Sequence, residues 1–576
     1  MPDTLPPLTP GAPPSKNEGI KTRSRALRGS ISEGLGVVVT GGLAEDDTQL
    51  TKFHGIYQQD DRDLRAERGR KRMEPAISFM ARLRIPGGRV NSQQWLQLTE
   101  IARERANGTI RLTTRQTVQY HGIIKGNLAP AISAVNDALL DTIAACGDVN
   151  RNVICTSNPH ASTAHAEALD LARRISDDLL PKSRAWHEIW IGEERVAGGE
   201  PEEEPLYGVT YLPRKFKIAI AVPPQNDVDV FAHDLGLIAI VRDGAVIGYD
   251  VSVGGGMGMT HGENDTFPRT GSVIGHCTPE QAVAVADAVV RAQRDHGDRS
   301  VRKHARLKYT VERMGLDAFR AEVERHLGYA LAAPHGAVFA GTGDHAGWSQ
   351  APDQTWQYGL FVENGRIHDL PDRKLLSGLR AIANVHRGEF VMTANQNLII
   401  AGVAPEDKAG VGALLQQHGL DGSASALRQA SMACVALPTC GLALAESERY
   451  LPDLVGLLDG VMAAAGIADD PIVLRMTGCP NGCARPYLAE IALVGRGPGR
   501  YHLYIGGAAD GTRLNKLYRR DVDQDGILSA VTPLIQDYAA GRVPGERFGD
   551  WVIRAGHIQA TTAGNRFHLD LAEGLA

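Results

Sequence analysis

The sequence has no hydrophobic run that approaches the roughly 18–20 apolar residues needed to span a bilayer. Its N-terminal segment, MPDTLPPLTPGAPPSKNEG, lacks the apolar stretch of a secretory signal. An excess of basic charge is missing too, since 61 Lys and Arg face 67 Asp and Glu, for a net charge of -6. That balance argues against a general binder of nucleic acid or anionic membranes. We therefore expect a cytoplasmic protein with neither kind of partner.

A nucleotide-binding fingerprint is also missing. No G-x-G-x-x-G opens a β-α-β unit, and the Gly-rich segment 254–259 (GGGMGM) lacks the helix and the acidic residue that should follow. Cysteine is scarce and odd in number, with 7 in 576 residues. Without an export signal, these thiols favour a reduced protein over a disulfide framework. The chain therefore shows no flavin or nicotinamide site of its own.

The chain repeats itself at long range. Its 576 residues, about four times a typical domain, predict several domains. Residues 110–123 and 390–403 carry Thr, Gln and Gly at matching places with a constant offset of 280, and two further pairs of segments match in the same order. This period is too long for a solenoid and predicts two fused halves with a ligand site between them. The further pairs are 87–90 with 364–367 and 249–256 with 501–507.

Alternating and helical hydrophobic patterns follow one another along the chain, which predicts a mixed α+β protein. Residues 92–106 have helical spacing, with Ser92 as the candidate N-cap, and 110–123 have the pattern of a strand or hairpin. The first 30 residues mix Pro, Ser, Gly and basic residues and predict a mobile arm, at least up to about Pro14. The other expected strands are 76–85, 215–223, 237–241 and 246–253, and the other expected helices are 130–145, 279–297 and 310–327.

Four of the seven cysteines lie within 50 residues of one another. Cys434 and Cys440 are spaced C-x5-C, and Cys479 and Cys483 are spaced C-x3-C, both in segments with Pro and Gly that favour loops. Such loops let backbone amides turn towards cluster sulfurs, so the pattern favours an iron–sulfur cluster with four thiolate ligands. Three other interpretations stay open on spacing alone: buried structural cysteines, a zinc site, for which C-x5-C is wide, and disulfides.

Basic residues recur in segments that otherwise have a buried pattern, where Lys and Arg are rare unless paired. Lys215 and Lys217 fall on one face of a core-like strand. If 110–123 is one strand, the even spacing of its polar residues puts them on one face as well. Such faces in a net-acidic chain predict an internal anionic ligand, although a solvated face or ordinary salt bridges would explain any single segment. The candidates are Arg82, Arg84, Arg111, Arg115, Gln119, His121, Arg151, Arg214, Lys215 and Lys217.

These residues stand in motifs that resemble those of a known family. The strings TCGLALAESER and TGCPNGC, with NRNVICTSNP, YLPRKFK and RLTTRQTVQYHG upstream, resemble the sulfite/nitrite reductase haemoprotein family over nearly the whole chain, 53–556. The resemblance implies a pseudo-twofold duplicated α+β fold with paired ferredoxin-like subdomains around a cofactor junction. The implied divisions are 1–65 (mobile arm and lead-in), 66–145 with 345–425 (the ferredoxin-like pair), 146–344 (a first sirohaem-binding domain) and 426–576 (a second domain with the cysteines).

The resemblance also implies two cofactors, a [4Fe–4S] cluster and a sirohaem, joined through a shared thiolate. We take Cys146 and Cys277 as structural, and Cys155 as either structural or near the site. The implied cluster ligands are Cys434, Cys440, Cys479 and Cys483, of which Cys483 would bridge to the sirohaem iron. The implied shell around the sirohaem carboxylates is Arg111, Arg115, Gln119, His121, Arg214 and Asn481. The implied substrate-side, catalytic face is Arg82, Arg151, Lys215 and Lys217.

The implied reaction is the six-electron reduction of sulfite to sulfide, in assimilatory sulfate reduction towards cysteine. The cationic groups would hold sulfite, and Lys215 and Lys217 would deliver protons. Electrons would come from a partner, either a flavoprotein (alpha) subunit with FAD and FMN fed by NADPH, or a ferredoxin. The alternatives are assimilatory nitrite reduction, electron transfer without turnover, and a structural zinc protein.

Overall fold

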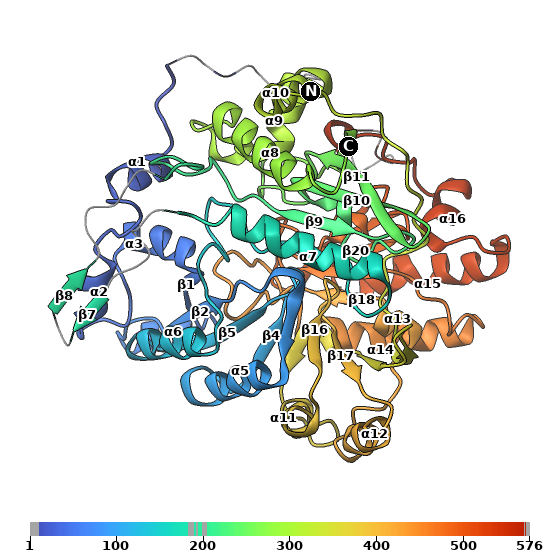
Figure 1. Cartoon of the computed structure of the whole chain (residues 1–576). Coiled ribbons are helices and arrows are strands. Elements are labelled where there is room, and N and C mark those ends of the chain that lie inside the picture. The colour runs from blue at the N-terminus through green and yellow to red at the C-terminus, as the bar shows by residue number, and fades with distance from the viewer. Residues whose placement is uncertain are drawn as a thin grey trace.

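The structure is a computed structural model of the chain and describes residues 8, 11–182, 189–191, 194–197, 204–569 and 571. Four five-stranded sheets, numbered 1 to 4 here, organise these residues, together with a hairpin of β7 (Ile189–Ile191) and β8 (Glu194–Ala197). Figure 1 shows the helices α5, α6, α11 and α12 at the bottom of the view and α8, α9 and α10 at the top, with strands between them.

Sheets 1 and 2 are built alike and exchange one strand each. β15, from the second half of the chain, pairs with β4 through Ile367 and Ile110, and β3, from the first half, pairs with β16 through Val90 and Phe390. The exchange interlocks the two halves, because neither sheet is complete without a strand from the other. Sheet 1 has the order β1 (Ile56–Asp60), β2 (Ile77–Arg82), β5 (Val118–Ile123), β4 (Ile110–Leu112), β15 (Arg366–Ile367), and sheet 2 has β13 (Gly347–Gln350), β14 (Trp356–Leu360), β17 (Leu398–Val403), β16 (Glu389–Met392), β3 (Arg89–Asn91).

Sheets 1 and 2 also share one apolar core with their helices. Trp95 stacks on Phe390 with ring centroids 4.8 Å apart, so a helix of the first half packs on a strand of the second. That helix, α5, begins with a capping box in which Asn91 and Gln94 exchange hydrogen bonds, so its cap is Asn91 and the prediction of Ser92 is wrong by one residue. The four helices are α5 (Ser92–Arg105), α6 (Leu128–Asp137), α11 (Leu375–Val385) and α12 (Lys408–Gln417).

Sheets 3 and 4 share one topology, in which three parallel strands are followed by two antiparallel ones. Each has its own apolar core. Sheet 3 contains β6 (Ile154–Cys155), β9 (Ile218–Ala221), β10 (Leu235–Arg242), β11 (Ala245–Val253) and β12 (Ser272–Cys277), with helices α7 (Thr163–Asp178), α8 (Ala282–His296), α9 (Leu307–Met314) and α10 (Leu316–Leu327). Sheet 4 contains β18 (Ser431–Ala433), β19 (Leu474–Thr477), β20 (Ile491–Gly497), β21 (Arg500–Ile505) and β22 (Lys516–Val522), with helices α14 (Leu451–Ala464), α15 (Gln524–Gly541) and α16 (Phe548–Arg554).

The predicted duplication is confirmed. Residues 110–123 form the hairpin β4–β5 of sheet 1, and 390–403 form β16–β17 at the same place in sheet 2. The helix expected at 310–327 is two helices, because the chain turns at Gly315, whose φ of 83° is open to glycine without steric cost. The helix expected at 130–145 ends at Asp137.

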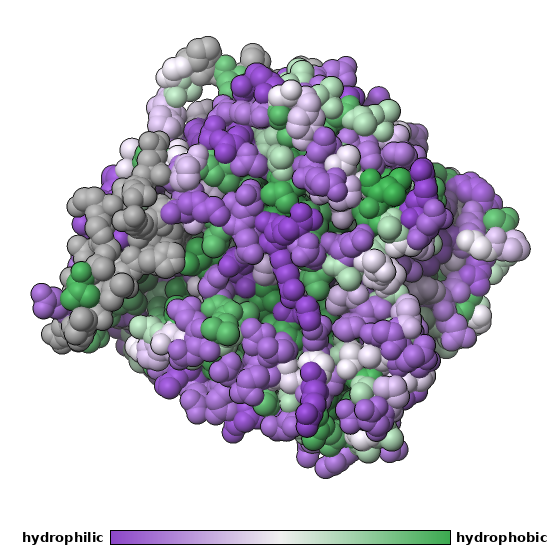
Figure 2. All heavy atoms as spheres, viewed as in Figure 1, coloured by the Kyte–Doolittle hydropathy of each residue, from purple (hydrophilic) through white to green (hydrophobic). Residues whose placement is uncertain are grey.

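The N-terminal arm is shorter than its composition suggests. The helix α1 (Lys16–Arg23) buries Ile20 and Lys21, so the expectation of an arm through the first 30 residues is wrong from Lys16 onward. The part of that expectation on residues 1–7, 9 and 10 lies outside the described residues. None of the described helices has the length and apolar character of a membrane span. Figure 2 shows a largely hydrophilic face on which hydrophobic residues lie in small groups.

Candidate functional site

The four predicted cluster ligands come from two neighbouring loops of sheet 4. Cys434 and Cys440 follow β18, and Cys479 and Cys483 follow β19. β18 and β19 are parallel neighbours, so the loops leave the same edge of the sheet. The carbonyl of Gly478 ties the loops together by accepting an N–H from the segment after Cys440 at 2.7 Å.

The four thiols are close enough to influence one another's ionisation. Burial, followed by the neighbouring Cys483, raises the pKa of the Cys479 thiol to about 12, and the same two causes raise the pKa of Cys434 and of Cys440. A backbone amide counteracts this effect of burial on the pKa of Cys434, since the N–H of Gly478 donates to the sulfur of Cys434 at 3.4 Å. Buried thiols that become thiolates need positive charge beside them, and a metal cluster supplies it.

The spacing of these sulfurs does not suit a single zinc ion. Tetrahedral Zn–S bonds of about 2.3 Å would place the sulfurs roughly 3.8 Å apart. Among the described residues, only one group of three metal-ligating side chains has its ligand atoms within 4.8 Å of one another, and it contains no cysteine. No three of the four thiols are therefore that close. The wider set favours a cluster of several irons over zinc.

A short backbone ladder brings together Lys215, Lys217 and Arg151. The N–H of Arg151 donates to the carbonyl of Phe216 at 3.0 Å, and the N–H of Phe216 donates to the carbonyl of Val149 at 3.1 Å. Phe216 is fully buried, so alternation turns its two lysine neighbours to the opposite face of the strand. The shared face predicted for the lysines is therefore confirmed, and Arg151 joins it.

The two lysine ammonium groups have no hydrogen-bond or ion-pair partner within the described part of the chain. Burial lowers the pKa of both Lys215 and Lys217 well below the usual value. The nearby guanidinium of Arg306 lowers the pKa of Lys217 further, whereas the thiol of Cys483 acts in the opposite direction. Lys217 is therefore close enough to the exposed thiol of Cys483 for the two groups to interact electrostatically. We call the face formed by Lys215, Lys217 and Arg151 the basic face, and it borders the same space as the cysteine loops.

One strand face does not carry all the polar residues of 110–123. These residues fold into a hairpin, so evenly spaced residues no longer share a face once the chain passes the turn between β4 and β5. Arg115 lies in that turn and leaves the face of Arg111 and Gln119, reaching the carbonyl of Ile218 at 3.1 Å. The prediction of a common face is wrong for Arg115.

Arg115 is nevertheless directed at the basic face. Burial, followed by Arg151, lowers the pKa of Arg115 to about 9. Its Nη1 contacts Nδ1 of His233 at 3.2 Å, and its buried Nε has no hydrogen-bond partner in the described part of the chain. An orphaned, buried guanidinium N–H is a group that an anionic ligand would satisfy.

A row of polar side chains crosses sheet 1. The strand register places Gln119 beside both Arg82 and Arg111, and residues paired across strands share a face. With the Gln119 amide turned so that its oxygen faces Arg82, that oxygen accepts from Nε of Arg82 at 2.9 Å. Arg111 is 1% exposed and forms an ion pair with Glu448, which also binds Arg366. Arg111 therefore already has a carboxylate partner, and its contact with a cofactor carboxylate stays a prediction.

His121 and Asn481 border the same region. His121 lies two residues after Gln119 and so on its face of the strand. Nδ1 of His121 contacts Gln59 at 3.2 Å, and its Nε2 has no partner among the residues that the structure describes. Burial lowers the pKa of His121 well below the usual value. The backbone and the side chain of Asn481 both lower the pKa of the Cys479 thiol, against the effect of burial. His121 is thus a neutral ring with a free nitrogen, and Asn481 supports the cluster loop directly.

Asp148 connects the N-terminal helix to the basic face. Its carboxylate accepts from Arg302 at 2.9 and 3.1 Å and lies 3.6 Å from Nζ of Lys21 on α1 and 3.9 Å from Arg214. Burial alone would raise the pKa of the Asp148 carboxyl, but Arg302 and Lys21 outweigh burial and hold it well below its usual range. Because Asp148 begins the segment that carries Arg151, this network fixes where α1 and that segment meet.

We expect Asp148→Asn to lower the free energy of unfolding by about 3–5 kcal/mol, because it removes the buried anion that Lys21 and the part-buried Arg302 share and leaves Lys21 with Glu18 alone. The depressed pKa means that the stabilisation is present above the unfolded-state pKa and is lost as the pH falls through the folded-state value. Urea unfolding of the two proteins at neutral and acid pH measures this difference. The control Asp170→Asn, in an exposed pair with Arg174, should cost less than about 1 kcal/mol. Equal losses in both variants would contradict this account.

The three cysteines outside the two loops differ in their surroundings, and the sequence did not indicate this difference. Cys155 and Cys277 are buried in the core of sheet 3, which agrees with a structural role. The N–H of Cys155 donates to the side chain of Gln116 at 2.9 Å. Cys146 is buried too, but Nη1 of Arg82 donates to its sulfur at 3.0 Å, so it lies beside the basic face and a purely structural assignment was incomplete.

Sequence reasoning missed two further cations here. Burial lowers the pKa of Lys52 to about 8, and Arg306 forms a double hydrogen bond with Asp234 at 3.0 and 2.8 Å. Both come from segments that only the tertiary fold brings to the basic face. Arg84, in contrast, pairs with Asp141 at 2.7 Å and is an ordinary salt bridge.

The Gly-rich segment 254–259 packs against the second cysteine loop. The N–H of Met259 donates to the carbonyl of Pro480 at 2.8 Å. A Cβ on Gly258 would come within 3.1 Å of the backbone oxygen of Asn481. Glycine here serves a close approach of two backbones.

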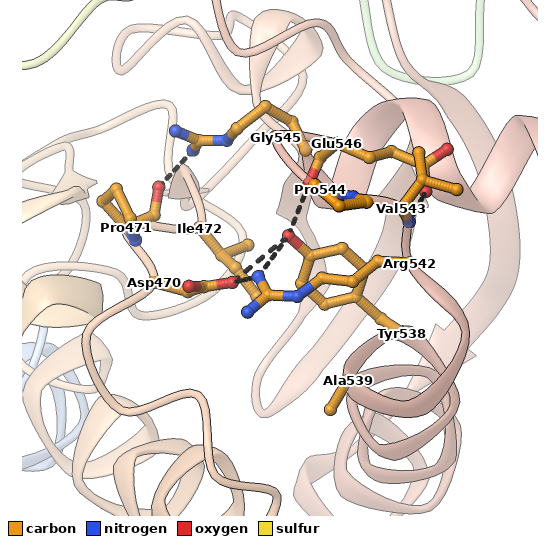
Figure 3. Close-up of a pocket in the computed structure, with 11 residues that line it drawn as sticks. Asp470, Pro471, Ile472, Tyr538, Ala539, Arg542, Val543, Pro544, Gly545 and Glu546 are labelled. Carbon is orange, nitrogen blue, oxygen red and sulfur yellow. Dashed lines mark hydrogen bonds and ion pairs between the residues drawn. The ribbon is translucent and has the colours of Figure 1, made fainter.

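A cavity of ≈480 Å³ lies apart from all these residues, around Asp470 and Tyr538. In Figure 3 Arg542 points at both of them, and the Tyr538 hydroxyl donates to the carbonyl of Glu546 at 2.9 Å. Its polar groups thus bind one another, so its size does not make it the functional site.

Comparison with known proteins places the chain among haem-containing reductases. The model of the nitrite and sulphite reductase 4Fe-4S domain matches 171–331, and that of the nitrite/sulfite reductase ferredoxin-like half domain matches 73–138 and 349–418. The first range contains none of the four clustered cysteines, which lie in the second half. The ferredoxin-like matches fall on sheets 1 and 2 and confirm the predicted fold class.

Curated relatives match over nearly their full length. The sulfite reductase [NADPH] hemoprotein beta-component of Chromohalobacter salexigens is 57% identical over 557 residues, covering 96% of this chain and 97% of that protein. Its counterparts in Myxococcus xanthus and Anoxybacillus flavithermus are 56% and 54% identical, covering 95% and 97% of this chain and 97% and 98% of their own. The structure of the Mycobacterium tuberculosis NirA protein shares the fold, with a TM-score of 0.77 at 25% identity over 95% of this chain and 97% of that one.

Proposed function

This chain belongs to the nitrite and sulfite reductase family, and from that premise we propose that it reduces sulfite to sulfide with six electrons. It is an oxidoreductase of the NADPH-dependent sulfite reductase haemoprotein type, and its cofactors are sirohaem and a [4Fe–4S] cluster. One observation carries the proposal: Lys215 and Lys217, whose ammonium groups have no partner among the described residues, border the same space as the exposed thiol of Cys483. Sulfite-dependent oxidation of a reduced viologen dye tests it, because a mere electron carrier would give no turnover.

The residues present fit both cofactors. Four thiols with amide support, spaced too widely for one zinc ion, are a suitable donor set for a [4Fe–4S] cluster. A polycarboxylate macrocycle needs buried cations with free N–H groups, and Nε of Arg115 and Nε2 of His121 are such groups. We propose that Cys434, Cys440, Cys479 and Cys483 hold the cluster, and that Cys483 is shared with the sirohaem. The proposed carboxylate shell is Arg111, Arg115, Gln119, His121, Arg214 and Asn481.

When bound, the two cofactors would store electrons and supply an iron that binds sulfite. The chain's part is to place and charge-balance the anion, and we assign that to Arg82, Arg151, Lys215 and Lys217. Preorganised cations act most strongly in a site with little water, where they need no rearrangement as charge moves. Arg151 is held in place by the carbonyl of Gly147 at 3.1 Å, and Arg82 by Gln119 and Cys146.

The lysines differ from the arginines in what they can do. An arginine stays protonated, but a lysine whose pKa is lowered by burial gives up a proton more readily near neutral pH. Nζ of Lys215 and of Lys217 donates to no protein acceptor among the described residues, so its protons are available to a bound oxyanion. We propose that these two ammonium groups protonate the oxygens that leave sulfite as water.

We propose that electrons arrive from a flavoprotein (alpha) subunit that carries FAD and FMN and takes them from NADPH, with a ferredoxin as the alternative donor. The surface beside Cys440 suits such a partner, because Leu442 is 68% exposed and Nη1 of Arg62 holds the Cys440 carbonyl at 3.3 Å. Directly after Arg62, the helix α4 (Arg65–Arg70) buries none of its residues. An exposed basic helix next to a cluster loop is complementary to an acidic electron-transfer protein.

Reversing charge at the exposed Arg70 and Arg72 is therefore expected to raise KM for the flavoprotein about tenfold, because rim charges act mainly on the association rate. Turnover with reduced viologen, which needs no docking, should not change. The control is charge reversal at the exposed Arg103 on α5. Raising the salt concentration should reduce the difference in KM for the flavoprotein between wild type and variant, because salt screens the surface charges. A loss of dye activity as well would place these arginines in folding instead of docking.

Nitrite reduction is the second candidate, since the family includes both activities. Two lysines beside two arginines favour the more highly charged sulfite over nitrite. Steady-state kcat/KM on the two anions discriminates, and a preference for nitrite would reverse the assignment. We place the sulfite activity in cytoplasmic sulfate assimilation towards cysteine.

A further inference from the structure

Four metal-ligating side chains meet where the C-terminal ends of α8 and α10 approach each other. Glu322 and His326 are one turn apart on α10, and Asp295 and His296 end α8. Nε2 of His326 lies 3.3 Å from Oε1 of Glu322 and 3.4 Å from Oδ2 of Asp295. Nε2 of His296 lies 2.9 Å from the same oxygen of Glu322. Asp295, Glu322 and His326 thus converge from two helices, and His296 contacts Glu322 beside them.

These separations are those of ligands around one ion. Metal–ligand bonds of about 2.1 Å put neighbouring ligand atoms roughly 3.4 Å apart in a tetrahedral site and 3.0 Å apart in an octahedral one. Atoms of Asp295, Glu322 and His326 all lie within 4.8 Å of one another, which no other set of three such residues does in the part of the chain that the structure describes. The side chains of Glu322 and His326 are 13% and 12% exposed, so little ordering remains for a metal to impose.

We propose that Asp295, Glu322 and His326 form a binding site for one transition-metal dication of the zinc class, with His296 beside Glu322 as a neighbour of the site. Imidazole nitrogen with carboxylate oxygen suits zinc, nickel or copper, whereas magnesium and calcium prefer oxygen alone. The site is separate from the cysteine loops and independent of the sulfite reaction.

Two arginines compete with the metal. Arg325 binds both carboxylate oxygens of Glu322 at 2.5 and 2.9 Å, and Arg294 binds Asp295 at 2.7 Å. The side chain of Arg325 is 61% exposed and can turn to solvent when a dication takes its place. Bound metal would join the ends of α8 and α10 and brace the segment after α8, which carries Arg302 to Asp148. We therefore expect zinc to raise the melting temperature without changing sulfite turnover.

The test is isothermal titration of the holoprotein with zinc chloride, with zinc content measured after gel filtration. We expect one zinc per chain with a micromolar dissociation constant and a rise in melting temperature. His326→Ala and Glu322→Gln should each weaken binding at least tenfold and abolish the rise. Arg325→Gln should strengthen binding severalfold, because it removes the competing cation.

The matched control is His160→Ala. Its ring also has two carboxylate neighbours, but Glu389 is near Nε2 at 3.4 Å and Asp353 near Nδ1 at 3.8 Å, on opposite sides of the ring. Those two oxygens cannot join the ring at one ion, so this variant should bind zinc like wild type. No zinc uptake at 1:1 stoichiometry, or equal affinity in wild type, His326→Ala and Glu322→Gln, would overturn the proposal.

Discussion

Replacing Cys483 with serine should reduce sulfite reduction to the background rate, because one change removes a cluster ligand and the link to the sirohaem. Cys483 is the exposed thiol of the four and the one whose charge reaches Lys217. A hydroxyl is a poorer ligand than a soft thiolate for iron in such a cluster. Loss of a partner that only supports a metal ligand typically costs 10–100-fold, so loss of the ligand itself should exceed about 100-fold. Dye-coupled turnover and the visible spectrum together measure the effect.

The matched control for this variant is Cys277→Ser. Cys277 ends the strand β12 and lies in the core of sheet 3, away from the cysteine loops. Its serine variant should keep both cofactors and the wild-type turnover, with a loss confined to stability. Full activity and an unchanged spectrum in Cys483→Ser would show that the bridging assignment is wrong.

Lys217→Met should leave both cofactors bound and slow sulfite turnover by about 10²–10⁴-fold, the usual contribution of a positioned proton donor. The methionine keeps most of the volume of the lysine stem, so the cost should fall on chemistry more than on packing. Lys217→Arg should restore anion binding but little of the rate, because arginine does not give up its proton. Turnover with reduced viologen, iron content and the visible spectrum separate these outcomes.

Lys308 provides the control, because it is a buried lysine with a purely structural environment. Its Nζ donates to the carbonyls of Gly256 at 3.2 Å and Gly258 at 2.7 Å, and to that of Phe267. Lys308→Met should therefore lower stability, since it leaves buried carbonyls without a donor. If Lys217→Met instead failed to assemble sirohaem, Lys217 would have a structural role like that of Lys308.

Lys217 should also affect how the rate of sulfite turnover depends on pH. Burial and Arg306 lower the pKa of Lys217 well below its usual value, so its protonated fraction falls as the pH rises through that lowered pKa. Turnover should decline on the alkaline side for this reason, and the decline should weaken in Lys217→Met. An unchanged alkaline limb in the variant would assign that titration to another group.

Sequence patterns predicted the repeat and the cysteine loops, because both depend on local residue order. The offset of 280 between 110–123 and 390–403 reappears as one hairpin in each of sheets 1 and 2. Lys215 and Lys217 were placed on one face, since alternation around the buried Phe216 is a local property. The exchange of β3 and β15 between the halves could not be predicted from local residue order, because it depends on the pairing of segments that are distant in the sequence.

The errors at the candidate site have the same origin. Arg115 was assigned to a strand face because a two-residue period was carried through a turn, where it no longer holds. Glu448 is distant in sequence from Arg111, so nothing nearby indicated that this arginine is already paired. Cys146 and Lys52 reach the basic face only through the fold, and the paired cations around Asp148 depend on α1, a segment whose composition indicated an arm.

The central claim is that the space bordered by Lys215, Lys217 and Cys483 receives sirohaem and sulfite. The visible spectrum of the protein, produced in a host that makes sirohaem and recorded before and after sulfite is added with reductant, tests it most directly. The account predicts a red-shifted, chlorin-like band that moves when sulfite binds. A protein that stays colourless after reconstitution with iron, sulfide and sirohaem would contradict it.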